Sequence, residues 1–95
     1  MVKIKLSGKF DINYKEFISL EPKQKENIWY KINIFQKKPS DTRLRNHKLT
    51  GKLNGKWAFS ITNDIRIVYE WKNKNTVRFL AIGGHKKVYG KNNEN

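Results

Sequence analysis

The chain has 95 residues, which is enough for one small domain and too few for two. Its 21 lysine and arginine residues outnumber its 8 aspartate and glutamate residues, and the formal net charge of +13 favours a polyanionic partner, nucleic acid first and an acidic protein second. The lack of cysteine excludes disulfides and thiolate metal sites, and no stretch approaches the roughly 18 apolar residues that span a bilayer. We therefore expect a soluble, cytoplasmic protein without a signal peptide.

The first half of the chain predicts one short strand and two helices. Residues 2–6 (VKIKL) alternate between apolar and charged side chains, as a strand does. Apolar side chains then recur at helical spacing in residues 10–20 and again in residues 22–38. Pro22 suits the first position of the second helix, and Pro39 would end it. The very short link between the helices predicts an antiparallel helical hairpin whose apolar stripes face the core.

The second half predicts a three-stranded antiparallel meander. Residues 40–55 form a polar connector rich in turn-forming residues. Beyond it, apolar residues recur at every second position in three segments, 56–62, 65–71 and 75–82. The predicted fold class is α+β, with a short N-terminal strand and a helical hairpin packed on one face of a small antiparallel sheet. One domain is expected to span residues 1–90, and residues 91–95 to form a disordered tail.

Strand alternation separates two faces of this sheet. Trp57, Phe59 and Ile67 lie on one face, whereas Ser60 and Arg66 lie on the other. If the helical hairpin covers the first face, the second face stays open for a ligand. An arginine in the middle of an apolar strand indicates either solvent or a bound anion, so Arg66 is a candidate phosphate-binding residue, with an ordinary exposed arginine as the alternative.

Several residues could cut RNA without a metal ion. Such cleavage needs a base for the ribose 2′-hydroxyl proton, an acid for the leaving 5′ oxygen, and cations for the phosphate. His85, which follows two glycines at a predicted strand end, is the strongest acid–base candidate. His47 in the connector and Asp64 in a turn could assist, or could only stabilise their loops. Tyr89 could stack on a base, share a proton transfer, or anchor the last segment.

The remaining charged residues indicate an electrostatic field rather than a metal site. Two histidines without cysteine, no H-x-x-x-H spacing and scattered acidic residues argue against zinc and against a two-metal nuclease, so neither a metal nor another cofactor is expected. Lysines near the candidate histidines would surround a bound phosphate with positive charge, or would simply be solvated: Lys48, Lys52, Lys56, Lys86 and Lys87.

Two segments resemble a known family. HKLTGKLNGKWAFSITNDIRIVYEW and AIGGHKKVYG are similar to the YafQ-like branch of the RelE/ParE toxin superfamily, through H-x-L-x-G, D-x-R-[IV]-x-Y and G-x-H-x-x-x-[FY] over residues 47–90. The resemblance implies a toxin of a type II toxin–antitoxin pair. It also implies a ribosome-dependent endoribonuclease that cuts mRNA in the A site by 2′-hydroxyl attack on the adjacent phosphate, without a metal ion, and an antitoxin that wraps the toxin.

The resemblance also implies roles for single residues. His47, Asp64 and His85 fall on positions that YafQ-like toxins use. Tyr89 matches by type, since the family also has phenylalanine there, and Arg66 falls on an arginine that RelE-type members use at the phosphate.

Two positions depart from the family pattern. Ser60 stands where YafQ has a further histidine, and Ala81 where it has an arginine. If both of those residues are needed for cleavage, this chain would be slow or inactive. Arg66 is then the candidate to supply the missing cation.

Two other functions compete with RNA cleavage. The first is a ParE-like toxin that acts on a protein target without catalysis. The second is a basic RNA-binding module, which would need aromatic side chains on the open sheet face as stacking platforms, and alternation offers only Phe79.

Overall fold

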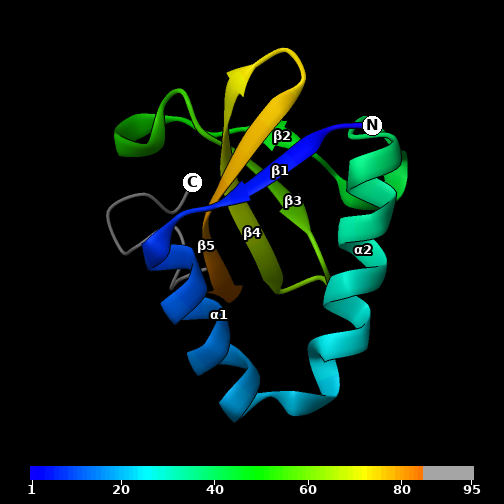
Figure 1. Ribbon diagram of the computed structural model, residues 1–95, viewed down its shortest axis with the longest axis vertical. Coiled ribbons are helices and arrows are strands. Elements are labelled where there is room, and N and C mark those ends of the chain that lie inside the picture. Colours follow the sequence, from blue (N-terminus) through cyan, green and yellow to red (C-terminus); the bar gives the residue numbers. More distant parts are fainter. Residues whose placement is uncertain (85–95) are drawn as a thin grey trace.

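The computed structural model describes residues 1–84, so the predicted domain end at residue 90 and the tail 91–95 lie outside the described residues. The elements of regular structure are β1 (Lys3–Leu6), α1 (Gly8–Leu20), α2 (Lys25–Lys37), β2 (His47–Lys48), β3 (Trp57–Ser60), β4 (Ile65–Asn73) and β5 (Thr76–Gly84), with single 3-10 turns at Pro22–Gln24, Thr42–Leu44 and Gly51–Leu53. The two helices pack on one face of a five-stranded sheet, which confirms the predicted α+β class (Figure 1).

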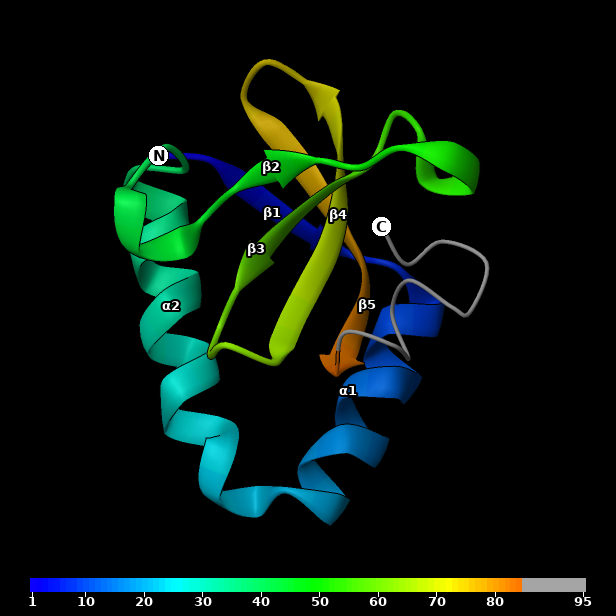
Figure 2. The same cartoon turned by 180° about the vertical axis from the view of Figure 1, so that it is seen from behind.

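The predicted helices form where the apolar spacing placed them. Ser7 starts α1 as its N-cap, since its hydroxyl accepts a hydrogen bond from the Phe10 amide at 2.9 Å. Pro22 begins the 3-10 turn between the helices rather than α2 itself. From this turn α1 and α2 run in opposite directions and spread apart (Figures 1 and 2). The hydrogen bond from the Trp29 indole to the Tyr14 hydroxyl, at 2.7 Å, joins them.

The sheet is larger than the predicted meander and is mixed. Strands β3, β4 and β5 pair antiparallel as expected, and the strand order is β1-β5-β4-β3-β2. The pairing of β1 with β5 is parallel, so the sheet is not antiparallel at this edge. Parallel neighbours need a long connection, which the helices and the other strands provide here. At the opposite edge, two residues of the polar connector form β2 and pair with β3.

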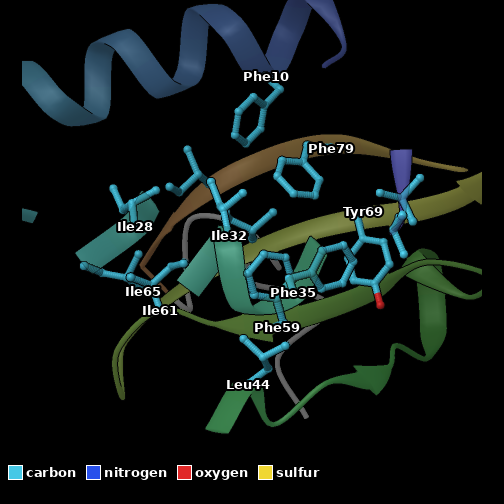
Figure 3. Close-up of a cluster of buried hydrophobic side chains, with 14 residues drawn as sticks. Phe10, Ile28, Ile32, Phe35, Leu44, Phe59, Ile61, Ile65, Tyr69 and Phe79 are labelled. Atoms are coloured by element: carbon cyan, nitrogen blue, oxygen red, sulfur yellow. The ribbon is translucent and has the colours of Figure 1, made fainter. Parts of the chain in front are cut away.

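The core lies between the helices and the sheet (Figure 3). Phe35 of α2 is fully buried at its centre and stacks on Phe59, with ring centroids 4.5 Å apart. Its other ring neighbours are Tyr69 at 4.9 Å and Phe79 at 5.9 Å. Each strand of the meander therefore contributes an aromatic ring to one contact with α2, and this contact fixes which sheet face the helices cover.

Phe79 is part of this core, and its prediction as a stacking platform on the open face is wrong. The ring is only 1% exposed and lies 5.5 Å from the ring of Phe10. Phe79 pairs with Tyr69 across the β4–β5 ladder, so both side chains point to the helices. A β-bulge follows at once, because Val68 pairs with Ala81 rather than with Leu80. Because of this extra residue, the side chains before and after it in β5 do not follow one alternating pattern of faces.

Candidate active site

The sheet face opposite the helices carries the candidate residues on a floor of small side chains. His47 pairs with Ala58, which pairs with Val68. In the next row, Arg66 of β4 pairs with Ser60 on one side. On its other side Arg66 pairs with Gly83 of β5. Since paired residues share a face, His47 and Arg66 point to the same side of the sheet, two strands apart across it and two residues apart along it, or about 12 Å in all. The larger apolar residues of this face, Leu49, Leu53 and Leu80, pack with Ala58 and Val68 in a separate small cluster.

Arg66 is held at one end of this face while its charge stays available. Its neighbours across the ladder have short side chains or none, so the half-buried guanidinium rises above them. Nη1 donates a hydrogen bond of 2.8 Å to the carbonyl oxygen of Thr62. A carbonyl orients the fork but carries no net charge, so this contact leaves the positive charge to act on an anion.

His47 is held in one tautomer by the connector. Its Nδ1 lies 2.9 Å from the carbonyl oxygen of Arg45. A carbonyl oxygen can only accept, so Nδ1 carries the hydrogen and the lone pair of the neutral ring lies on Nε2. The ring is exposed. His47 therefore offers a proton-accepting nitrogen on the same face as Arg66.

Ser60 adds a buried hydroxyl beside Arg66. The residue is 4% exposed, and its Oγ has no hydrogen-bond partner among residues 1–84. Buried polar groups normally have partners, so this hydroxyl is an unsatisfied polar group next to the guanidinium within residues 1–84. Sequence comparison marked Ser60 only as a departure from the family.

Asp64 lies in the bend before β4, and its carboxylate reaches the last residue of β5. The hydroxyl of Thr62 accepts hydrogen bonds from the amides of Asp64 and Ile65, at 3.3 and 3.1 Å, and so organises the turn. The Asp64 carboxylate lies 3.0 Å from the point where Gly84 would carry a Cβ. A side chain at position 84 would make the carboxylate shift, and the close approach places the carboxylate at the residue that precedes His85.

Four of the predicted site residues, His85, Tyr89, Lys86 and Lys87, lie outside the described residues. The three other predicted lysines lie in different surroundings. Lys56 binds Glu70 at 3.2 Å, whereas Lys52 is exposed in the 3-10 turn Gly51–Leu53. Lys48 pairs with Trp57, so its side chain lies on the helix side of the sheet, away from Arg66. The structure therefore does not gather these lysines around one point.

The open face also carries an ion cluster that the sequence analysis missed. Arg78 of β5 donates two hydrogen bonds to one carboxylate oxygen of Glu70, at 3.0 and 2.7 Å. Lys56 and Lys72 lie 3.2 and 4.0 Å from the same carboxylate group. The register across the β4–β5 hairpin, in which Glu70 pairs with Arg78, was the signal that could have predicted it. One carboxylate thus fixes three cations near the candidate site.

Glu70 should make the stability of the protein depend on pH. Burial opposes its ionisation, but hydrogen bonds from Lys56 and Arg78 outweigh that effect and lower its pKa from the ordinary 4.5. A lowered pKa contributes stability above the unfolded value that is lost as the pH falls through the folded value. We expect Glu70→Gln to lower the free energy of unfolding by about 1 kcal/mol at pH 7. Urea unfolding should show this difference shrinking below about pH 4.5.

The control for this experiment is Glu21→Gln, at an exposed carboxylate between the helices. Both substitutions raise the net positive charge equally, so general repulsion affects both proteins alike. A Glu70→Gln loss that equals the Glu21→Gln loss, or that persists unchanged at acidic pH, would contradict the specific role of the cluster.

Residues 1–84 contain neither a cluster of metal-ligating side chains nor a membrane-spanning helix. No three histidine, cysteine, aspartate or glutamate residues in this part lie close enough to hold a metal ion together. None of its helices has the length and apolar content of a membrane span.

Comparison with known proteins places the fold in one family. The model of the family described as "Bacterial toxin of type II toxin-antitoxin system, YafQ" matches residues 2–90. No curated protein sequence matches the chain. Among solved structures, YafQ from E. coli is similar with a TM-score of 0.78 and 18% identity over 95% of this chain and 100% of its own.

Two further solved structures are similar over nearly their whole length. YafQ in the E. coli DinJ–YafQ toxin–antitoxin complex has a TM-score of 0.76 and 20% identity, over 94% of this chain and 98% of its own. A metal-bound toxin from Helicobacter pylori has a TM-score of 0.70 and 26% identity, over 94% of this chain and 100% of its own. The fold and the matched family define a bacterial toxin of the type II toxin–antitoxin class. Within that class, the chain belongs to the YafQ family.

Proposed function

We propose that the protein is a ribosome-dependent endoribonuclease that cuts mRNA in the A site without a metal ion. One observation carries the proposal: a histidine with its lone pair on Nε2 and an arginine oriented by a neutral carbonyl share the sheet face that the helices leave uncovered. RNA is the matching substrate because its 2′-hydroxyl can attack the neighbouring phosphate, whereas DNA lacks that group.

In the proposed reaction, Nε2 of His47 takes the proton of the 2′-hydroxyl. The oxygen attacks the adjacent phosphorus, the bond to the 5′ oxygen breaks, and a cyclic phosphate forms. Arg66 donates its hydrogen bonds to the phosphate oxygens as charge develops. His85, the residue after Gly84, is the proposed acid that protonates the leaving 5′ oxygen. Asp64, whose carboxylate lies against Gly84, is proposed to orient it.

Residues outside the central pair have supporting roles in this proposal. Tyr89 would stack on a base or share the proton transfer. Lys56, held in the Glu70 cluster, is proposed to contribute to the positive electrostatic field around the phosphate, and Lys52, Lys86 and Lys87 are proposed to add to this field.

The histidine roles are tested by His47→Gln and His85→Gln in cleavage of mRNA on programmed ribosomes. Loss of a general acid or base lowers rates by about two to four orders of magnitude. We expect the cleavage rate of each variant to fall by that amount. Each variant should also lose a different limb of the pH–rate profile: His47→Gln the limb set by the general base, and His85→Gln the limb set by the general acid. Circular dichroism and antitoxin binding should match the wild type.

Three results would count against this function. Full activity in either variant would remove that histidine from the mechanism. Identical pH profiles in the two variants would exclude the division into base and acid. Growth arrest on induction with intact mRNA and with supercoiling defects would favour a ParE-like action on a protein target instead.

We further propose that the protein acts in the cytoplasm and is neutralised by an antitoxin that is acidic where it binds. The net charge of +13 supports this partner, and the similar YafQ of E. coli has been solved with its antitoxin DinJ. Association steered by opposite charges slows as salt is added. An association rate that stayed constant with rising salt in stopped-flow mixing would contradict the acidic contact surface.

A further inference from the structure

A hollow of about 530 Å³ lies between the connector and the helix-side surface of β3 and β4. Trp57 and Trp71 line it from the strands, and Arg45 and Asn46 line it from the connector. This hollow is separate from the candidate active site, because Trp57 points to the opposite sheet face from Ser60 and Arg66. Its volume suits one small ligand group.

The walls of the hollow are held in place by the core. Both indoles pack on the buried Tyr69, with ring centroids at 6.4 Å for Trp57 and 6.0 Å for Trp71. The Tyr69 hydroxyl donates a 2.7 Å hydrogen bond to Asn46 Oδ1, and Asn46 Nδ2 donates one of 3.0 Å to the Pro39 carbonyl. These bonds join the strand to the connector, so the walls of the hollow lose little conformational entropy when a ligand binds.

The charges at the hollow favour an anion. Arg45 is exposed, with a left-handed φ of 49° that its neighbours must maintain. Lys48 does not line the hollow itself, but its ammonium lies 5.5 Å from the ring centroid of Trp57, which does. The one carboxylate in the wall, Asp41, accepts hydrogen bonds from Arg43 at 3.0 and 2.9 Å, which hold its pKa at about 2 and offset its charge.

We propose that this hollow binds one unpaired nucleotide of single-stranded RNA, with the base against Trp57 and Trp71 and a phosphate at Arg45 and Lys48. Stacking on aromatic rings beside cations is how proteins hold single strands without reading their sequence. The hydrogen bond between His47 Nδ1 and the Arg45 carbonyl joins the connector wall of the hollow to the proposed base, and a strand held here has to pass around the β2 edge of the sheet to reach the cleavage site on the other face. The proposal rests on RNA being the substrate.

The test uses a short single-stranded adenine oligonucleotide with 2′-O-methyl groups, which cannot be cut by 2′-hydroxyl attack. Binding, followed by tryptophan fluorescence and by the indole N–H signals in NMR, should shift the signals of Trp57 and Trp71. Losing one stacked base weakens binding by about tenfold. We expect this loss in Trp71→Leu, with most affinity restored in Trp71→Phe. Arg45→Asn, which tolerates the left-handed backbone, should weaken binding and make the dependence of affinity on salt shallower.

Two controls match these changes elsewhere on the molecule. Trp29→Leu removes a half-exposed indole of α2, and Lys25→Gln removes an exposed charge at the start of α2. Both should bind the oligonucleotide as the wild type does. The 2′-O-methyl oligonucleotide is not cut, so a protein without cleavage activity can still confirm the hollow, and the two proposals fail separately.

Measuring the affinity for ribosomes distinguishes two possible sources of the nucleotide, mRNA and ribosomal RNA. If it comes from mRNA, Trp71→Leu should weaken binding only to ribosomes carrying mRNA, and if it comes from ribosomal RNA, binding to empty ribosomes should weaken too. Equal oligonucleotide affinity in wild type, Trp71→Leu and Arg45→Asn would overturn the proposal. So would a Trp71→Leu protein that loses only antitoxin affinity, because the hollow would then be a protein-docking site.

Discussion

Replacing Arg66 by glutamine should lower the rate of mRNA cleavage on the ribosome by about two to three orders of magnitude, the loss measured when a positioned donor to a developing oxyanion is removed. The proposed role depends on the fork, which is aimed by the Thr62 carbonyl and stands above Ser60 and Gly83. Arg66→Lys keeps the charge and loses the parallel donors, so we expect an intermediate rate. Single-turnover cleavage, with folding checked by circular dichroism, measures both.

Lys72→Gln is the matched control, since Lys72 lies farther along β4 and its ammonium is 4.0 Å from Glu70. It removes the same charge from the same strand, and the cleavage rate should change by less than about threefold if position matters more than total charge. Equal losses of cleavage rate in Arg66→Gln and Lys72→Gln would show that Arg66 contributes only to the general positive charge of the protein. An unchanged rate in Arg66→Gln would remove it from the site.

Phe35→Ala should lower the free energy of unfolding by about 3–5 kcal/mol, as truncation of a fully buried phenylalanine does. The ring contacts Phe59, Tyr69 and Phe79, so its loss leaves a cavity between α2 and three strands at once. Small domains have a total stability of about 5–15 kcal/mol, so the variant should be close to unfolding at body temperature. Urea unfolding at 25 °C gives the difference directly.

Ile12→Ala on α1 is the control for this change, because Ile12 is 69% exposed and contributes little to the core. Its free energy of unfolding should stay within about 0.5 kcal/mol of the wild type. Phe35→Leu refills most of the volume and should fall between the two variants. A loss below about 1 kcal/mol in Phe35→Ala would show that α2 is not held by this aromatic contact.

The faces of the central strands follow from the sequence alone. The period of two in β3 and β4 placed Ser60 and Arg66 opposite Phe59 and Ile67, and the structure confirms this placement. The side chains of an extended backbone alternate whatever the strand pairs with, so a single strand already determines which residues share a side. The candidate phosphate-binding arginine was predictable for this reason.

The pairing of distant segments was not predictable from local patterns. β1 lies beside β5, about seventy residues later in the chain, and β2 consists of two residues inside a polar connector. The bulge in β5 turned Phe79 toward the helices. The roles of His85 and Tyr89 stay predictions, made from their residue types and positions and from the family motif.

The sequence by itself therefore determined the two helices, the meander, the strong positive charge and the side of the sheet on which Arg66 lies. Each of these depends on neighbouring residues and on the fixed geometry of helix and strand. The tertiary structure decided the mixed sheet and the tryptophan-lined hollow. These features join segments far apart in the chain, and their register is set by the free energy of packing Phe35, Tyr69 and Phe79 into one core.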